Sequence, residues 1–351
     1  MRIVGGTAVQ IQSSPSTVYL QLQDSPTTAY RCNGSIIDSL HVVTTAYCLY
    51  TASGTEATPA ALLVEAGISN LDAQAPTDAL QSRSVTAIRI DPFYTPVASS
   101  FADDVAVLTL ESPLDFSGPA VKAVALPAAK TPLPGGTPVS IAAFGRETFN
   151  VPPSGQLESM SATVEAQTQC GDYTGDTLFA NQNSTVMCFK GSSSTTTCNE
   201  DGGAGVLTTG GTPTLVGIAI SPTSGTCEIG GQNTFLYVAA PEILDFIEGS
   251  DSPPRAPRRT SSVKLHLDYA VPLRPGSKLT CSSTGWTTPV HITYAFSNES
   301  SGKILQATSA RPTYVVKAKD VGVNILCDMH VTGSGGTLIV SPLSTLKVAR
   351  K

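Results

Sequence analysis

Short apolar stretches recur along the first 248 residues, and clusters of Gly, Pro, Ser, Thr and Asn separate them. Apolar stretches of this length, bounded by turn-forming residues, are typical of β-strands. We therefore expect strands at Thr17–Leu22, Ser35–Ile37, Val85–Ile90, Val105–Leu110, Val139–Ala143 and Leu215–Ile220. Many short strands separated by turns predict an all-β fold, as in paired β-barrels.

One segment near the end of this region has a helical period instead. Pro241 stands in its first turn, and Ile243, Phe246 and Ile247 fall on one helical face. Proline suits the first turn because its missing N–H would have no partner within the helix there. The sequence therefore predicts a short helix over Pro241–Ile247.

The chain has 351 residues, which is more than one average domain and fits two. Residues 249–261 read GSDSPPRAPRRTS and contain almost nothing apolar. Adjacent prolines with serines and arginines predict an exposed and fairly stiff linker. We expect this linker to separate a domain over residues 3–248 from a second domain over residues 262–351.

The second domain has the pattern of a β-sandwich. Cys281 and Cys327 each lie in a predicted strand, and Trp286 follows the first of these cysteines by five residues. This pattern resembles the immunoglobulin-like repeats of bacterial surface and secreted proteins, which implies a disulfide between two sheets with the tryptophan against it. Ile325 occupies the position where antibody-type domains carry a tyrosine. The resemblance is therefore to a sandwich of this kind and not to an antibody domain.

Charge differs between the two parts. Residues 3–248 carry 7 Lys/Arg and 22 Asp/Glu, a net charge of −15, whereas residues 262–351 carry 10 and 4, a net charge of +6. Ordinary variation with a role in solubility is the favoured interpretation. The alternative is that the basic domain contacts an anionic surface such as a cell-wall polymer or polysaccharide. No motif indicates nucleic-acid binding, and no apolar run approaches the ~20 residues of a membrane span.

The eight cysteines indicate an oxidising compartment, because their even number suits a disulfide framework. Without a CxxC pair or a histidine cluster, zinc is a poor alternative. We therefore expect a secreted, extracellular protein with no metal and no cofactor. Glycosylation sequons begin at Asn33, Asn183 and Asn298, but such tripeptides arise by chance in a chain rich in Ser and Thr.

Four segments of the first domain carry the chemistry. They read Ile3-Val4-Gly5-Gly6, His41-Val-Val-Thr-Thr-Ala-Tyr47-Cys48, Asp103-Asp104-Val-Ala-Val-Leu108 and Cys198-Asn-Glu200-Asp201-Gly202-Gly-Ala-Gly205. In order and spacing they resemble the trypsin/chymotrypsin-like serine proteases, whose versions are IVGG, TAAHC, DIAL and GDSGGP. The resemblance implies a double β-barrel that ends in a short helix.

The same resemblance places Tyr47 at the catalytic histidine position and Gly202 at the serine position, with Asp104 as the orienting carboxylate. Acyl transfer needs a hydroxyl nucleophile and a base. Glycine supplies no nucleophile, and a phenol accepts protons poorly near neutral pH. Glu200 replaces the glycine of the oxyanion hole, which puts a carboxylate where negative charge must develop. His41, the one histidine of this domain, is interpreted as a packed strand residue and not as a substitute base.

The resemblance also assigns an activation pair. In the family, cleavage before the isoleucine frees an ammonium that pairs with the aspartate before the nucleophile, and Ile3 and Asp201 match this pair. Its retention fits both a pocket that is still ordered this way and simple inheritance. As written, Met1 and Arg2 block the pairing.

A specificity pocket is assigned in the same way. Thr196 stands at its base, where trypsins carry an aspartate, so no fixed charge is expected to hold Arg or Lys. Ser221, Pro222 and Thr223 form its wall, where Thr223 narrows the entrance and an open edge would pair with an extended peptide. The resemblance implies three disulfides in the first domain: Cys32–Cys48, Cys170–Cys188 and Cys198–Cys227. Cys281 and Cys327 remain for the second domain.

Two functions are compatible with these residues. The favoured one is a secreted, catalytically inactive serine protease homologue that binds an extracellular protein or glycan, as a regulator, inhibitor, decoy or adhesin. The alternative is a hydrolase with a non-standard site. It is either a residual serine-type endopeptidase, or an enzyme in which two of the carboxylates of Asp104, Glu200 and Asp103 form the pair that glycoside hydrolysis requires.

Overall fold

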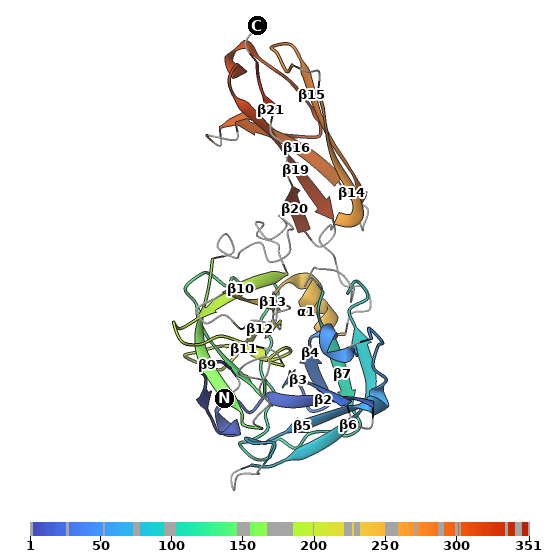
Figure 1. Cartoon of the computed structure of the whole chain (residues 1–351), viewed down its shortest axis with the longest axis vertical. Helices are drawn as coiled ribbons and strands as arrows, with labels where there is room; N and C mark the ends of the chain where they lie inside the picture. The colour runs from blue at the N-terminus through green and yellow to red at the C-terminus, as the bar shows by residue number, and fades with distance from the viewer. Residues whose placement is uncertain are drawn as a thin grey trace. The chain divides into compact units, whose positions relative to one another are not determined.

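The structure is a computed structural model. It describes residues 3–25, 28–51, 53–72, 78–94, 103–145, 155–166, 185–198, 200–220, 227, 232–249, 259–269, 272–286, 291–298, 301, 303–333, 336–340 and 346–349. Strands predominate (Figure 1). The chain divides into two compact units, one of Met1–Ala180 with Ser184–Asp251, and one of Ser252–Lys351 with Asn181–Asn183. The two units are described separately.

The first barrel of the first unit closes in the order β2-β3-β4-β7-β6-β5. Its strands are β2 (Thr17–Ser25), β3 (Thr28–Ile36), β4 (His41–Thr44), β5 (Leu62–Ala66), β6 (Gln81–Ile90) and β7 (Ala106–Leu110). Alternate side chains turn inward, as the pleat of a strand requires, so Val18, Leu20 and Leu22 of β2 are all buried in one core. Three short 3₁₀ helices lie in the connections: Ile11–Ser13, Ala46–Leu49 and Pro59–Ala61.

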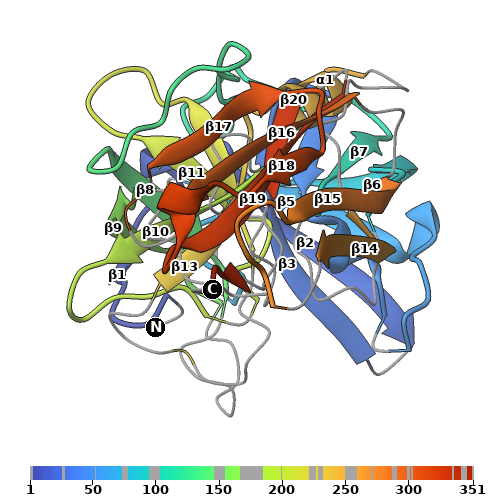
Figure 2. The ribbon, with the colours of Figure 1, turned by 90° about the horizontal axis from the view of Figure 1, so that it is seen from above.

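The second barrel has the order β9-β10-β13-β12-β11-β8 and is closed by the β8–β9 pairing. Its strands are β8 (Pro138–Ala143), β9 (Glu158–Val164), β10 (Val186–Gly191), β11 (Gly205–Thr208), β12 (Leu215–Ala219) and β13 (Gln232–Tyr237), and β1 (Thr7–Ala8) adds to β9. The two barrels lie side by side within the unit (Figures 1 and 2).

The predicted helix is present with the predicted bounds, as α1 (Pro241–Ile247). Ile243, Phe246 and Ile247 are buried, as their shared helical face requires. Arg89 of β6 caps the helix end, because its guanidinium donates to the carbonyls of Phe246 and Ile247 and lies over the Phe246 ring.

The second unit contains two antiparallel sheets. One has the order β14 (Arg259–Tyr269), β15 (Lys278–Trp286) and β18 (Thr313–Val315). The other has the order β17 (Ile304–Ser309), β16 (His291–Asn298), β19 (Asn324–Gly333) and β20 (Gly336–Val340), with β21 (Leu346–Lys347) on β19; a 3₁₀ helix spans Ala318–Asp320. The Cys281–Cys327 disulfide joins β15 to β19. Two sheets joined in this way are consistent with a β-sandwich. The Trp286 side chain lies outside the described residues.

Several elements begin or end at other residues than expected, and two of these differences are instructive. The predicted strand Ser35–Ile37 was only the end of β3, because polar residues interrupt the apolar ones over residues 28–33 and leave no apolar run that would reveal a strand. Strand β14 begins at Arg259, inside the segment predicted as linker, and pairs with β15. Arginine and threonine occur in paired strands as well as in exposed linkers, so these residue types did not reveal where the strand begins. In the described part of the chain, no helix is long and apolar enough to cross a membrane.

Candidate functional site

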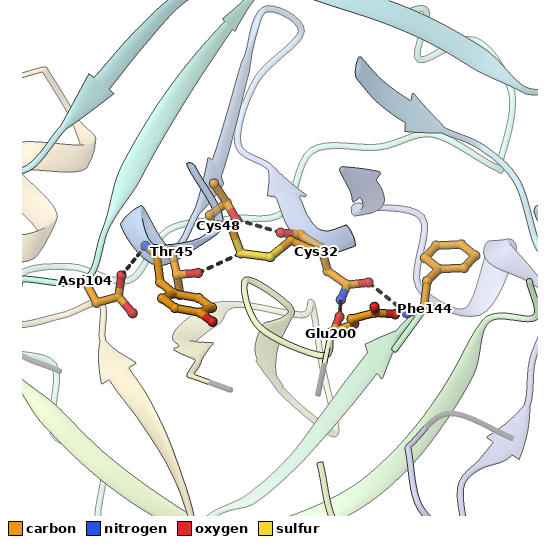
Figure 3. Close-up of a disulfide and its surroundings, with 9 residues drawn as sticks. Cys32, Thr45, Cys48, Asp104, Phe144 and Glu200 are labelled. Carbon is orange, nitrogen blue, oxygen red and sulfur yellow. Dashed lines mark hydrogen bonds between the residues drawn. A yellow bond between two sulfur atoms is a disulfide. The ribbon is translucent and has the colours of Figure 1, made fainter. Parts of the chain in front are cut away.

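The first feature of the site is the link between Tyr47 and Asp104. Tyr47 lies in the 3₁₀ helix Ala46–Leu49 that follows β4, and the Cys32–Cys48 disulfide ties this helix to β3. The backbone N–H of Tyr47 donates to Oδ1 of Asp104 over 2.8 Å. Figure 3 shows Asp104 on one side of the disulfide, with Glu200 and Phe144 on the other. The structure therefore brings the segments that contain Tyr47, Asp104 and Glu200 together around one disulfide.

The side chains of Tyr47 and Asp104 have opposite environments. Asp104 is 2% exposed, whereas Tyr47 is 59% exposed. Burial raises the pKa of Asp104 to about 7; the N–H groups of Tyr47 and Ala46 work against this rise, and the charge of Asp103 adds to it. Asp104 thus serves as an acceptor for backbone N–H, while the Tyr47 ring is open to solvent.

Asn33 of β3 holds the loop that contains Glu200 and Gly202. Its backbone N–H donates to the Gly202 carbonyl over 2.9 Å, and its side-chain Nδ2 donates to the Glu200 carbonyl over 2.7 Å. Its Oδ1 accepts from the N–H of Phe144, just after β8, over 2.8 Å. Asn33 is fully buried. This role was not predicted from the sequence, because the partners of Asn33 lie far away along the chain.

The loop has a strained backbone at Glu200. Its φ is 68°, in the left-handed region that favours glycine. A side chain in that region costs on the order of 1 kcal/mol. Gly203 has a φ of 81°, and a Cβ there would overlap the Asn33 carbonyl oxygen. The loop thus keeps, at residue 200, a backbone conformation that favours glycine, although this residue is a glutamate.

The predicted activation pair occupies the interior. Ile3 is fully buried in the core of the second barrel, and Val4 forms an antiparallel bridge with Thr196. Asp201 is 1% exposed, and its Oδ2 accepts from the N–H of Cys198 over 2.7 Å. The N-terminal segment is therefore seated beside the pocket loop, and the pairing of Ile3 with Asp201 stays a prediction.

The base of the predicted pocket is neutral and bonded internally. Oδ1 of Asn233 accepts from Oγ1 of Thr196 over 2.9 Å and from Oγ1 of Thr197 over 2.5 Å. All three residues are buried. The sequence predicted Thr196 at the base of the pocket but not Asn233, because Asn233 lies far from Thr196 along the chain. Residues 221–223, the predicted wall, lie outside the described residues.

The predicted disulfides and the sequon at Asn33 are compared with the structure next. The structure contains the Cys32–Cys48, Cys198–Cys227 and Cys281–Cys327 disulfides. Cys188 is also disulfide-bonded, and Cys170 lies outside the described residues. The sequon at Asn33 is not accessible in the folded protein, because its amide is buried and donates to Glu200.

The interpretation of His41 was partly wrong. It begins β4, as expected for a strand residue, but its side chain is not packed in the interior. Its Nδ1 lies 2.8 Å from Oδ2 of Asp38, and the side chain is 36% exposed. The turn before β4 places Asp38 beside the ring, since Asp38 also accepts from the backbone N–H groups of Leu40 and His41.

This double barrel, with its site between the barrels, is the fold of the chymotrypsin-like serine proteases. The trypsin family profile matches residues 3–247, so the chain belongs to the trypsin family. Trypsin delta and trypsin gamma of Drosophila erecta are each 31% identical over 219 residues, 62% of this chain and 77% of theirs. Chymotrypsin-C of Mus musculus is 26% identical over 205 residues, 58% of this chain and 70% of its own.

Among solved structures, one titled "Structure of GrC" has the same fold. Its TM-score is 0.58 at 19% sequence identity, and the match covers 70% of this chain and 98% of that chain. The family match ends at residue 247, directly before the predicted linker.

Proposed function

We propose that this chain is a secreted, non-catalytic member of the trypsin family that acts by binding an extracellular protein or glycan. The observation that carries the proposal is the environment of residue 47. Its side chain is a solvent-exposed phenol, and its contact with Asp104 is made by the backbone. The carboxylate that would orient a catalytic imidazole accepts this backbone N–H, and residue 47 supplies no imidazole for it to orient.

The changes at 200 and 202 support the same function. Gly202 offers no hydroxyl for attack on a carbonyl. Glu200 brings a carboxylate to the loop whose N–H groups stabilise an oxyanion in active relatives, and negative charge there opposes that stabilisation. Disulfides in both units support secretion into an oxidising compartment. The linker and the basic second domain suit a tethering or adhesive role.

The carboxylate-based hydrolase gains no support. Asp103 and Asp104 are each 2% exposed, so a substrate in the cleft would not reach either carboxyl group. Glycoside hydrolysis requires two carboxyl groups that flank the scissile bond.

The proposal is tested by active-site labelling with a fluorophosphonate probe, beside an active trypsin as the positive control. We expect the native chain to stay unlabelled and to hydrolyse no peptide substrate, whereas stoichiometric labelling would contradict the proposal. The triple variant Tyr47→His, Gly202→Ser, Glu200→Gly, with a matched variant that has Gly202→Ala in place of Ser, measures how much of the catalytic frame survives. Binding is tested by capture of partners from the native extracellular fluid, with and without residues 262–351.

A further inference from the structure

Three tyrosines lie close together in the first unit, Tyr47, Tyr50 and Tyr94, and the backbone N–H of Tyr47 donates to Asp104. The Tyr50 and Tyr94 rings lie 5.7 Å apart, centroid to centroid, at an angle of 45°. Burial raises the pKa of Tyr94, and Asp104, Tyr50 and Tyr47 raise it further. Tyr47 is 59% exposed, whereas Tyr50 and Tyr94 are half-buried, so the group is open to solvent chiefly at Tyr47. We call the three tyrosines the aromatic cluster.

Backbone hydrogen bonds fix the cluster from two sides. Tyr47 and Tyr50 lie at the 3₁₀ helix Ala46–Leu49, where the N–H of Tyr50 donates to the Tyr47 carbonyl over 3.2 Å. Tyr94 lies on the turn after β6, where its N–H donates to the carbonyl of Asp91 over 3.0 Å. Oδ1 of the same buried Asp91 accepts from the N–H of Phe93 over 2.9 Å. A surface held in this way binds with little loss of conformational entropy.

The electrostatics around the cluster have one sign. The charged groups that shift the pKa values of its tyrosines are carboxylates: Asp104 beside Tyr94, and Glu56 beside Tyr50, where burial is again the larger cause. The Tyr50 hydroxyl lies 3.5 Å from Oε2 of Glu56. Residues 3–248 as a whole have a net charge of −15. The surface is therefore complementary to a positive charge.

From the geometry we propose that the aromatic cluster is a docking surface for a lysine or arginine side chain of a polypeptide partner, an inference that rests on the proposed binding function. The faces of aromatic rings attract cations, and nearby carboxylates add to that attraction. A basic side chain lays its aliphatic stem along an exposed ring and keeps its charged end toward the acids. A neutral sugar ring would stack on the same rings, but it carries no positive charge for Asp104 and Glu56 to attract.

The experiment uses the full chain and two short peptides, acetyl-Ala-Lys-Ala-amide and its Nε-acetyllysine counterpart, which has a similar stem without the charge. Binding is followed at pH 8 by NMR of the tyrosine ring resonances. We expect the lysine peptide to shift the rings of Tyr47 and Tyr94 and to bind at least about fivefold more tightly than the acetylated peptide. Equal affinities, or a neutral oligosaccharide that binds better than the lysine peptide, would overturn the inference.

Variants separate the cluster from the rest of the surface. Tyr47→Leu keeps an apolar side chain but removes the ring, and Asp104→Asn removes the charge but keeps an acceptor for the Tyr47 N–H. Each is expected to weaken binding of the lysine peptide at least about threefold. The matched control is Leu80→Ala, since Leu80 is 39% exposed and directly precedes β6, at the end of the strand away from Tyr94. An equal loss in the control would count against the inference.

The two proposals fail in different ways. Labelling of the native chain by the fluorophosphonate probe would end the non-catalytic function whatever the peptides do. An unlabelled chain that does not distinguish the two peptides would end only the inference about the cluster.

Discussion

The buried floor of the candidate site and its solvent-exposed mouth differ in how far their side chains are tied into the fold. On the floor, Asp104 and Asp201 are each at most 2% exposed and accept backbone N–H groups, from Tyr47 and Cys198. At the mouth, the position of the base carries the exposed ring of Tyr47. The floor residues hold the loops in place through these hydrogen bonds, whereas the exposed Tyr47 ring contributes little to the stability of the fold. The burial and backbone hydrogen bonds of Asp104 and Asp201 therefore give both carboxylates a structural role.

The largest expected effect comes from breaking the floor at Asn33. In Asn33→Ala, the Glu200 carbonyl and the Phe144 N–H lose their partner. An unsatisfied buried polar group costs about 1–3 kcal/mol, so we expect a loss of about 2–4 kcal/mol from two such groups. The measurement is urea unfolding of the first unit, followed by near-UV circular dichroism.

The second unit provides an internal reference for this measurement, because the only tryptophan of the chain, Trp286, lies in β15. Its fluorescence transition is expected to stay unchanged. Gln23→Ala is the control on the exposed hairpin of the same barrel, where substitutions change stability by less than about 0.5 kcal/mol. If Asn33→Ala were as mild as this control, the loop would not depend on Asn33.

The next effect depends on pH and concerns Asp104. Burial raises its pKa to about 7 in the folded state, from the ordinary value of 3.8 that it has in the unfolded chain. The folded state therefore holds a proton that the unfolded state has lost between these two values, so the stability contributed by this group falls as the pH rises through that window. Above pH 7 the ionised, buried carboxylate is a net cost to the folded state. Asp104→Asn removes this dependence.

We therefore expect Asp104→Asn to be more stable than the native chain at pH 8, by about 2–4 kcal/mol, since each tenfold change in proton affinity corresponds to about 1.4 kcal/mol. The difference should shrink as the pH falls to 4, where the folded state of both chains is neutral at this position. Urea unfolding at both pH values measures it. The opposite trend, with the variant relatively less stable at pH 8, would show that Asp104 gains more from its hydrogen bonds than it loses by burial.

The sequence was sufficient for the fold, because the fold depends on local patterns, whereas the assignment of changed catalytic positions stays a prediction. Short apolar stretches predicted six strands of the first unit, and the proline with its apolar face predicted α1 with its bounds. It was not sufficient for Asn33 or Asn233, because their partners, Glu200 and Thr196, lie far away along the chain and meet them only in the folded protein. The same holds for the aromatic cluster, which unites residues from two separate loops.

The smallest expected effect is at the mouth, in Tyr47→Leu. The bond from residue 47 to Asp104 is made by the backbone N–H, so it survives this change, and the ring that is lost is 59% exposed. We expect the stability of the first unit to change by less than about 0.5 kcal/mol, although binding of the lysine peptide weakens. A loss comparable to that of Asn33→Ala would mean that the ring is part of the fold, and the contrast between floor and mouth would then fail at the residue on which it depends most.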